Sequence, residues 1–436
     1  MYLQSIQLHN FKCFESFKID FSKELTVIVG NNGSGKTSIL DGIAIAMGTI
    51  FTAMDGLSGR KISASDAHVK AFKVGSADDV QQQYPVNVEA VAEIDNKKYK
   101  WHRSLNSSEG KTTIVASKNI RMFARELQSK LREGDDGVEL PMIAYYGTNR
   151  IWDYHREKKS DSFRSSTRTN GYIDCLSGTT NLKLMLNWFR KSTVQKYQRL
   201  EKNLPVVSTH SAVYKAIEKC FEQMTGYEDS NVYYNMDTNE LNIDYTDTNG
   251  YRMSEPFGNL SDGYKCTISL IADIAYRMAV LNPQYSDNVL TETQGLIMID
   301  EVDLHLHPKW QQKVIGALQS IFPKIQFIVT THAPAVINSV YSKNLRILSD
   351  REIVNAGSEV YGKDVGSVLG EIMGTSQRPI YVQEQFDLFY KFVNEKKFTE
   401  AREVLDGLDK IRNYNDSEVA SCRVKLKLEE FRGGVK

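Results

Sequence analysis

The pattern of apolar and polar positions changes its period along the chain, and each period predicts one type of element. Short, almost fully apolar runs rich in β-branched residues predict buried strands, most clearly at 25–29, 295–299 and 325–329. Apolar residues three and four positions apart predict helices instead. One such helix directly follows the first buried strand, with apolar positions at Ile39, Leu40, Ile43, Ala44 and Met47. Buried strands followed by helices indicate an α/β fold.

Weaker patterns occupy the segments between these strands. The alternation in VNVEAVAEI and KYKWHRSL, on either side of a polar turn at 95–97, predicts two paired strands. Residues 231–254 predict further strands broken at two polar turns. Helical spacing predicts two short helices before them, at 182–203 and 211–224. No heptad repeat is sustained, so we expect no long coiled coil.

The last part of the chain has a helical pattern throughout. Three amphipathic helices are predicted there, at 381–395, 399–412 and 416–431. A Toprim nuclease would need carboxylates at the ends of strands, and this segment predicts no such strands. We therefore expect a short C-terminal helical region without a nuclease.

A glycine-rich loop separates the first buried strand from the helix that follows it. The sequence GNNGSGKT at 30–37 matches G-x-x-x-x-G-K-[ST] in the strand–loop–helix context that this motif requires. Backbone N–H groups of such a loop cradle phosphates, and the helix N-terminus adds a positive dipole end. We expect Lys36 to reach the β- and γ-phosphates and Thr37 to ligate Mg²⁺. The predicted nucleotide-binding residues of this loop are Asn31, Asn32, Gly33, Ser34, Gly35, Lys36, Thr37 and Ser38.

The other two buried strands end in residues that suit phosphoryl chemistry. GLIMI at 295–299 delivers Asp300 and Glu301 at its carboxyl end. We expect Asp300 to hold Mg²⁺ through water, and Glu301 to orient and deprotonate the attacking water. The strand at 325–329 leads into His332, which we expect to contact the γ-phosphate. Glu301, His332 and Lys36 are therefore the predicted catalytic residues.

Composition narrows the class of protein only slightly. The 436 residues include 54 basic and 54 acidic side chains, so net charge argues neither for nor against nucleic acid. Five scattered cysteines without a C-x-x-C pair make a disulfide framework or zinc site unexpected and fit a reducing compartment. No apolar run approaches the ~20 residues of a membrane span, and the N-terminus has no signal-peptide plan. We expect a cytoplasmic protein without a membrane partner.

Two local segments are basic. Residues 150–168 interleave basic side chains with Trp152, Tyr154 and Phe163, and 121–132 carries three arginines near one helical face. Either segment is a candidate for DNA contact, and the alternative for both is a solvated surface. His305 and His307, with Asp303, have the residue types of a metal cluster, but we expect them to lie at a dimer seam, and a metal site is the alternative.

Taken in order, these motifs resemble the ABC-type ATPases of the SMC/RecF-like branch. IQLHNFKCF at 6–14 resembles the first strand and turn of that branch, GNNGSGKT its Walker A motif, and LSDGY at 260–264 its signature motif. MIDE at 298–301 resembles Walker B, Asp303 stands at the D-loop position, and His332 at the H-loop position. The resemblance implies an ATPase head at 1–350, with a mixed β-sheet, flanking helices and a helical insert at about 172–228. Residues 351–436 would form a C-terminal helical contact region.

The resemblance also implies a mechanism with ATP and Mg²⁺. Such heads form head-to-tail dimers that enclose two ATP molecules, so Ser261, Asp262 and Gly263 would contact the nucleotide held by a second copy. Lys12 would join the nucleotide-binding residues. The glutamine loop of the family has no convincing counterpart. Asn149 or Arg150 is a positional candidate, and Gln81 to Gln83 are alternatives.

The motif forms YYGT, IDEVDLHLHPKWQ, TTHAPAVI and VLGEIMGTSQRP most resemble ATPases of bacterial anti-phage defence. PtuA-type ATPases of Septu and retron-associated systems are the first choice. They imply a partner HNH nuclease of the PtuB type, and an oligomer of the ATPase. AriA-type ATPases of PARIS systems, which store and release a toxic nuclease, are the alternative. A RecF-type clamp that acts on DNA directly is a third hypothesis.

Overall fold

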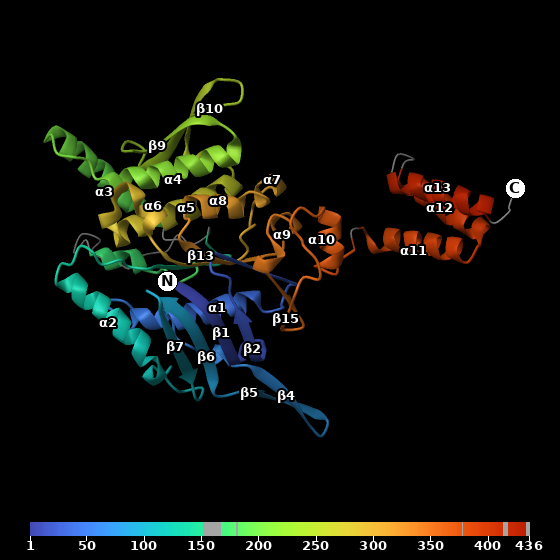
Figure 1. Ribbon diagram of the computed structural model, residues 1–436, viewed down its shortest axis with the longest axis horizontal. Helices are drawn as coiled ribbons and strands as arrows, with labels where there is room; N and C mark the ends of the chain where they lie inside the picture. The colour runs from blue at the N-terminus through green and yellow to red at the C-terminus, as the bar shows by residue number, and fades with distance from the viewer. Residues whose placement is uncertain (151–166, 180–181, 377, 413–416, 433–436) are drawn as a thin grey trace. The chain divides into compact units, whose positions relative to one another are not determined.

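The computed structural model describes residues 1–150, 167–179, 182–376, 378–412 and 417–432. The chain divides into a larger unit, Met1–Lys363, and a smaller unit, Asp364–Lys436 (Figure 1). We expected the ATPase head to end at 350. β14 (Leu345–Ser349) and β15 (Glu352–Val354) form a hairpin that belongs to the main sheet, so the larger unit extends past residue 350. The end of the ATPase head at 350 stays a prediction.

The main sheet has six strands in the order β15-β14-β3-β13-β12-β8. All neighbours from β14 to β8 are parallel, so their carboxyl ends lie at the same edge. Every residue of β8, β12 and β13 is buried, which explains their uninterrupted apolar runs. The three expected buried strands are confirmed as β3 (Leu25–Gly30), β12 (Gly295–Ile299) and β13 (Ile325–Thr331), and β8 comprises Met142–Tyr146.

Helix α1 (Lys36–Phe51) lies between this sheet and a second, antiparallel sheet. It contacts β3, β8 and β13 on one side and β1 and β6 on the other, and nearly all of its side chains are buried. The second sheet has the order β2-β1-β6-β7. Its strands are β1 (Tyr2–Phe11), β2 (Phe14–Asp20), β6 (Val86–Ile94) and β7 (Lys97–Leu105), and the last two confirm the expected pair.

The helical insert and its own small sheet form the other side of the larger unit (Figure 1). Helix α4 packs on α5 and on β9, and α3 also contacts α5. These elements are α3 (Leu182–Glu201), α4 (Ser208–Thr225), α5 (Asp262–Leu281), β9 (Glu228–Asn235), β10 (Glu240–Thr246) and β11 (Arg252–Pro256). The two helices and the strands expected here are therefore confirmed. The α/β fold class, with a mixed sheet, flanking helices and a helical insert, is confirmed as well.

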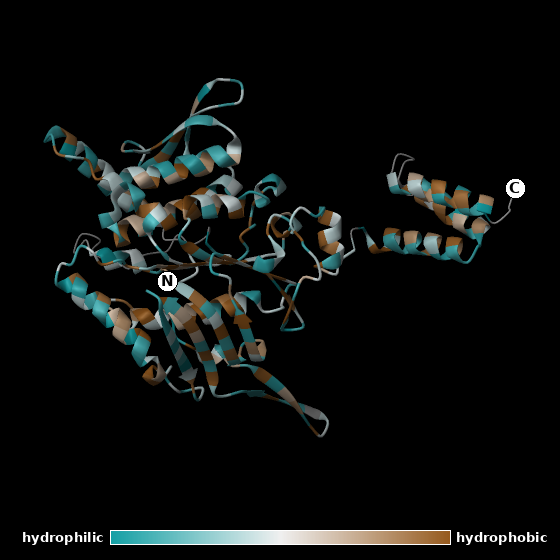
Figure 2. Cartoon of the chain, viewed as in Figure 1, coloured by the Kyte–Doolittle hydropathy of each residue, from teal (hydrophilic) through white to brown (hydrophobic). Residues whose placement is uncertain are grey.

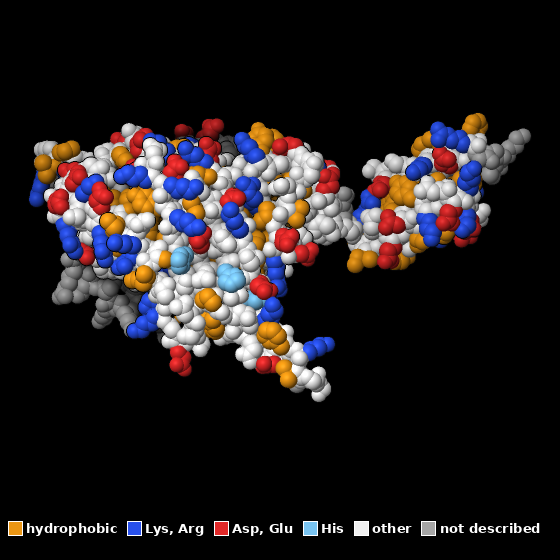
Figure 3. Space-filling view, turned by 60° about the horizontal axis from the view of Figure 1, so that its bottom comes forward, with side chains coloured by type: hydrophobic (Ala, Val, Ile, Leu, Met, Phe, Trp, Pro, Cys, Tyr) orange, Lys and Arg blue, Asp and Glu red, His pale blue; other side chains and the backbone are white. Residues whose placement is uncertain are grey.

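Shorter elements complete the larger unit. Hairpin β4–β5 projects from it, and Figure 3 shows apolar, basic and acidic side chains along the projection. These elements are β4 (Val69–Val74), β5 (Ala77–Gln82), α2 (Lys118–Arg132), α6 (Val289–Glu292), α7 (Pro308–Gln311), α8 (Val314–Ile321) and α9 (Pro334–Ile337). None of the helices in the described ranges combines the length and the apolar character that crossing a membrane requires.

The smaller unit has a hydrophobic core of its own. Helices α11 (Ile380–Asn394), α12 (Phe398–Arg412) and α13 (Ser417–Arg432) confirm the expected C-terminal helices, and α10 (Val365–Glu371) precedes them. Figure 2 shows apolar residues alternating with polar ones along these helices. Their apolar faces enclose a core of Phe386, Phe389, Val393, Ala401, Leu405, Leu408, Val419, Cys422 and Leu426.

Candidate nucleotide site

The carboxyl ends of three parallel neighbours bring the predicted motifs together. β13 pairs with β3 on one side and with β12 on the other, and Val329 is the partner of both Val27 and Ile299. The phosphate loop follows β3, Asp300 and Glu301 follow β12, and His332 follows β13. Ligands of α/β sheets bind outside the carboxyl ends of the strands, so this edge is the place to examine for a nucleotide.

The phosphate loop requires glycine where it turns into α1. Gly35 has a φ of 109°, which strongly favours glycine. A Cβ atom there would also lie 2.5 Å from the Phe14 ring and 2.7 Å from the Cys13 sulfur, so the turn between β1 and β2 closes against the loop. No side chain caps the first turn of α1. Its N–H groups therefore remain directed into the loop, as a phosphate site requires.

Lys36 lies against the loop that it follows. Its ammonium group donates to the carbonyl oxygens of Gly30 at 2.8 Å and Asn31 at 3.1 Å, and the residue is 6% exposed. Burial lowers the pKa of Lys36, and the nearby carboxylates of Asp300 and Glu301 oppose that effect. The charged group is therefore at the mouth of the loop, within the field of the acidic residues.

Thr37 and Asp300, the two predicted Mg²⁺ ligands, are in direct contact. The Thr37 hydroxyl donates to Oδ2 of Asp300 at 2.8 Å, and the Thr330 hydroxyl donates to Oδ1 at 2.6 Å. A hydroxyl and a carboxylate are the oxygen ligands that Mg²⁺ prefers when phosphate oxygens and water complete its shell. These residues therefore fit the ion that the resemblance implies.

Glu301 and His332 face a common space. Together with Asn31, Asn32 and Asp303 they line an open cavity of about 380 Å³ beside the phosphate loop. The Thr331 hydroxyl donates to Asp303 at 2.6 Å and fixes that carboxylate. Burial and the Lys36 charge lower the pKa of His332, which favours the neutral form of its imidazole. The cavity is thus lined by two carboxylates, an imidazole and two amides.

The signature residues lie outside this cavity. Ser261 caps α5 through its backbone only, and both Ser261 and Asp262 are exposed. Gly263 faces the segment that follows Walker B, because a Cβ atom there would lie 2.7 Å from the His305 carbonyl oxygen. The structure therefore brings the signature next to the D-loop segment of its own chain. Its predicted contact with a nucleotide on a second copy stays a prediction.

Lys12 has a different neighbourhood from the one expected. Its ammonium group pairs closely with Asp41 of α1 and lies 3.8 Å from Asp66. Arg60 reaches the other oxygen of Asp41 at 2.7 Å. Lys12 is not among the residues that line the cavity. The geometry assigns Lys12 to the turn that supports Gly35, and its nucleotide contact stays a prediction.

The candidates for the glutamine loop differ in their burial and in their contact with Walker B. Asn149 is exposed, and Gln81 and Gln82 are exposed on the projecting hairpin. Arg150 instead is buried against Walker B and donates to the carbonyl oxygens of Asp300 and Glu301. Sequence reasoning missed Thr330 and Thr331, whose hydroxyls hold Asp300 and Asp303. Two threonines directly before His332 were the available signal.

The DNA and metal candidates receive little structural support. Residues 151–166, which include Trp152, Tyr154 and Phe163, lie outside the described residues. On α2, Arg132 pairs with Asp55 at 2.5 Å. Among the described residues no group of three or more histidine, cysteine, aspartate or glutamate side chains has a metal-binding arrangement. That search includes Asp303, His305 and His307.

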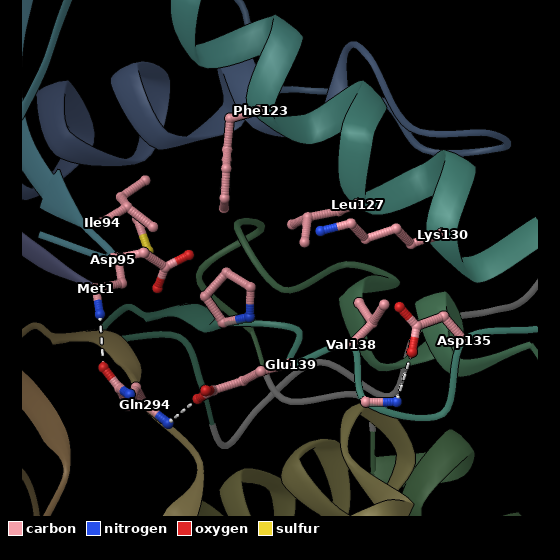
Figure 4. Close-up of a pocket in the computed structure, with 12 residues that line it drawn as sticks. Met1, Ile94, Asp95, Phe123, Leu127, Lys130, Asp135, Val138, Glu139 and Gln294 are labelled. Carbon is pink, nitrogen blue, oxygen red and sulfur yellow. Dashed lines mark hydrogen bonds between the residues drawn. The ribbon is translucent and has the colours of Figure 1, made fainter. Parts of the chain in front are cut away.

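Another cavity lies near the opposite end of β12 (Figure 4). It has a volume of about 260 Å³, and Phe123 and Leu127 of α2 point into it. Gln294, the residue before β12, donates its backbone N–H to Glu139 at 3.0 Å in its wall. This cavity is at the amino end of a parallel strand, so it is a poor place for the nucleotide.

Comparison of the chain with models of protein families shows the family to which it belongs. Residues 5–228 of the 436 match a model described as an AAA domain. The chain belongs to the AAA-domain family. A second AAA-domain model, whose description also refers to the AbiEii toxin of type IV toxin–antitoxin systems, matches 177–338. Together the two matches include the phosphate loop, Asp300, Glu301 and His332, and this AAA-domain protein is an ATPase.

Whole-chain relatives of this AAA-domain protein come from defence systems. It is 26% identical to the retron Vc95 probable ATPase of Vibrio cholerae, over 88% of this chain and 81% of the relative. It is 28% identical to the retron Ec83 probable ATPase of Escherichia coli, over 86% and 76%. Septu protein PtuA of Bacillus thuringiensis is 26% identical over 93% of each chain. The resemblance to PtuA-type and retron ATPases is therefore confirmed.

Solved structures similar to this AAA-domain protein include SMC heads. The SMC head domain from Thermotoga maritima matches with a TM-score of 0.39 and 17% identity, over 82% of this chain and 100% of that one. An Smc head bound to the C-terminal winged-helix domain of ScpA matches with a TM-score of 0.45 and 17% identity, over 81% and 98%.

Proposed function

We propose that this chain is the ATPase subunit of an anti-phage defence complex, in which ATP binding and hydrolysis control a separate nuclease that cuts DNA. The observation that carries the proposal is similarity along most of the chain to retron and Septu ATPases, combined with a nucleotide site assembled from three strand ends. The relatives supply the biological setting, and the geometry supports the ATP-dependent step.

Within one subunit, each residue of the proposed site has its own role in ATP binding or hydrolysis. The phosphate loop and Lys36 bind the phosphates, while Thr37 and Asp300 hold Mg²⁺, which neutralises phosphate charge when bound. Glu301 orients the attacking water and accepts its proton. The neutral imidazole of His332 forms a hydrogen bond with the γ-phosphate. Asn31 and Asn32, which share the cavity with Glu301 and His332, help to enclose the nucleotide.

We further propose that two copies close head to tail over two nucleotides. Ser261 and Asp262 are exposed at the start of α5, and no side chain caps that helix. An uncapped helix N-terminus is suited to an anion supplied from outside the chain. A phosphate on the second copy would complete this arrangement, so ATP would stabilise the dimer and hydrolysis would weaken it.

The partner is proposed to be an HNH nuclease, which the resemblance to Septu ATPases implies. The C-terminal helices are the proposed contact region for this nuclease or for further copies of the chain. Several of their large apolar side chains are exposed, including Ile380 at 74% and Phe431 at 85%. On the face shown in Figure 3, basic and acidic side chains are interspersed.

The first experiment is co-expression of the chain with its neighbouring genes, followed by purification with ATP and native mass spectrometry. We expect a stoichiometric nuclease bound to a multimer of this chain, and a smaller assembly for Lys36→Ala. A bare dimer that shifts DNA only with ATP would favour the RecF-type alternative. A Toprim-type toxin in place of the nuclease would favour the AriA-type alternative.

The assignment of the general base has its own test. Glu301→Gln removes the proton acceptor but leaves the phosphate loop, Thr37 and Asp300 in place. We expect ATP affinity to stay within about threefold and turnover to fall by at least about 10²-fold. Fluorescent-nucleotide titration and phosphate release measure the two quantities. Turnover at the wild-type rate would show that Glu301 is not the base.

A further inference from the structure

Arg150 spans the peptide groups that carry the Walker B acids. Its Nη1 donates to the Asp300 carbonyl oxygen at 2.7 Å and to the Gly147 carbonyl oxygen at 3.1 Å. Its Nη2 donates to the Glu301 carbonyl oxygen at 2.8 Å. The residue is only 3% exposed. A planar guanidinium can bridge two successive carbonyl groups in this way, whereas a lysine ammonium offers a single point of contact.

The backbone of Glu301 needs such support. Its φ is 48°, in the left-handed region that costs free energy for any residue other than glycine. The Thr330 hydroxyl accepts the Glu301 N–H at 2.8 Å, and Arg150 holds the Glu301 carbonyl. Both polar groups of this residue are therefore fixed, which determines the direction in which its carboxylate leaves the strand end.

Arg150 also reaches the helix that begins with the signature. Burial raises the pKa of the Cys266 thiol in α5, and the Arg150 guanidinium partly opposes this rise through its charge and a hydrogen bond. Cys266 lies in the first part of α5, two residues after the signature motif. The same helix start touches the D-loop segment, where Gly263 faces the His305 carbonyl. Arg150 thus lies where the end of β8, the end of β12 and the start of α5 meet.

We propose that Arg150 is a positioning residue for ATP hydrolysis: it holds the Glu301 backbone in its left-handed conformation. The proposal rests on the proposed role of Glu301 as the base. Arg150 acts through this peptide group and not on the nucleotide, because it is absent from the cavity lining.

The test is a double-mutant cycle on the full-length chain, with Arg150→Gln, Glu301→Gln and the double variant. Arg150→Gln should lower kcat by about 10- to 100-fold while KM and ATP affinity change by less than about threefold. In the Glu301→Gln background, Arg150→Gln should cause little further loss, because the two residues act as one unit. A single-turnover assay with labelled ATP resolves the residual rates. Arg150→Lys should restore only part of the rate.

Arg103 provides the matched control. It is also buried, at 2% exposure, and its guanidinium also donates to two backbone carbonyls, those of Ile45 and Arg60. Arg103→Gln should lower the melting temperature and leave kcat per folded molecule unchanged. If the Arg150→Gln variant fails to fold, Arg150→Lys is compared with wild type and with Arg103→Gln instead.

Two results would overturn the proposal. One is a kcat for both Arg150 variants within twofold of wild type. The other is a full additional loss in the Glu301→Gln background, which would mean that the residues act independently. The Glu301→Gln variant alone reports on the proposed base, so failure of that assignment is seen separately.

Discussion

At the scale of single residues, hydroxyl groups organise the acidic side chains of the site before any ligand is considered. Thr37 and Thr330 each donate to one oxygen of Asp300, and Thr331 donates to Asp303. These bonds keep each carboxylate in one orientation. Because the carboxylates are oriented in advance, less free energy is needed to order the site when ATP and Mg²⁺ bind.

Two lysines near the loop should differ sharply in their effect on ATP binding. Lys36→Ala removes the ammonium group that lies on the phosphate loop, and we expect ATP affinity to fall by at least about tenfold. Lys12→Ala breaks a contact with Asp41 and should lower stability with ATP affinity within about threefold. Isothermal titration with ATP and thermal unfolding measure both effects. A large loss of affinity in Lys12→Ala would support the nucleotide contact that the sequence predicts for Lys12.

At the scale of elements, the start of α5 and the segment after β12 form one packed unit. Tyr264 of α5 lies edge-to-face on Trp310 of α7, with ring centroids 4.8 Å apart. Gly263 leaves no room for a side chain against the His305 carbonyl. The signature and the D-loop segment are therefore expected to move together, because neither can shift without disturbing this contact.

Gly263→Ala should separate these two segments. Its new Cβ atom would lie 2.7 Å from a backbone oxygen, so one segment must shift. We expect turnover to fall at least about tenfold while ATP affinity of the phosphate loop is retained. Gly316→Ala in α8 is the control, because a Cβ atom there meets nothing within 4 Å. Wild-type turnover in Gly263→Ala would argue against a role for this contact in hydrolysis.

The pair of helices α3 and α4 should be sensitive to acid through His210. Burial lowers the pKa of His210 to about 4, and its ring lies edge-to-face on Trp188 of α3, with centroids 5.1 Å apart. In the unfolded chain the pKa of His210 has its ordinary value of 6.5, whereas in the folded chain it is about 4. Between these values the unfolded state binds more protons, so stability falls as the pH drops through this window.

His210→Gln should remove this part of the acid sensitivity. Between pH 7.5 and pH 5, wild type should lose about 1 kcal/mol more stability than the variant, after allowance for the partial exposure of His210. Urea unfolding at the two pH values measures the difference. Equal losses in both proteins would show that His210 is protonated as easily in the folded chain as in the unfolded one.

At the scale of the whole molecule, the nucleotide site and the C-terminal helices belong to different units. Every residue of the phosphate loop, Walker B and the signature lies within Met1–Lys363, whereas Asp364–Lys436 has its own apolar core. Units with separate cores can fold separately. ATP binding by the larger unit and the association with partners can therefore be measured in separate experiments.

A shortened chain of residues 1–363 should bind ATP with an affinity within about threefold of the full chain, because it keeps the complete site. We expect it to lose the association with the nuclease or with further copies. Nucleotide titration and native mass spectrometry of the two forms test this. A shortened chain that assembles like the full one would place the contacts on the larger unit.

Much of this architecture could be predicted because its signals are local. The strands at 295–299 and 325–329 are buried on both faces, so nearly every residue in them is apolar. The loop at 30–37 combines glycine, lysine and threonine at a spacing that few other structures require. The place of β15 in the sheet was less predictable, because β15 belongs to the sheet only through its pairing with β14.

The sequence by itself determined the buried strands, the helices and the identity of the residues that end the strands, because period and residue type are properties of short segments. Only the tertiary structure decided which side chains support them. Thr330 holds Asp300, Arg150 holds Glu301 and Asp41 holds Lys12 through contacts between residues distant in the chain. Such contacts depend on which strands and helices lie side by side, and the local pattern of apolar and polar positions does not specify those neighbours.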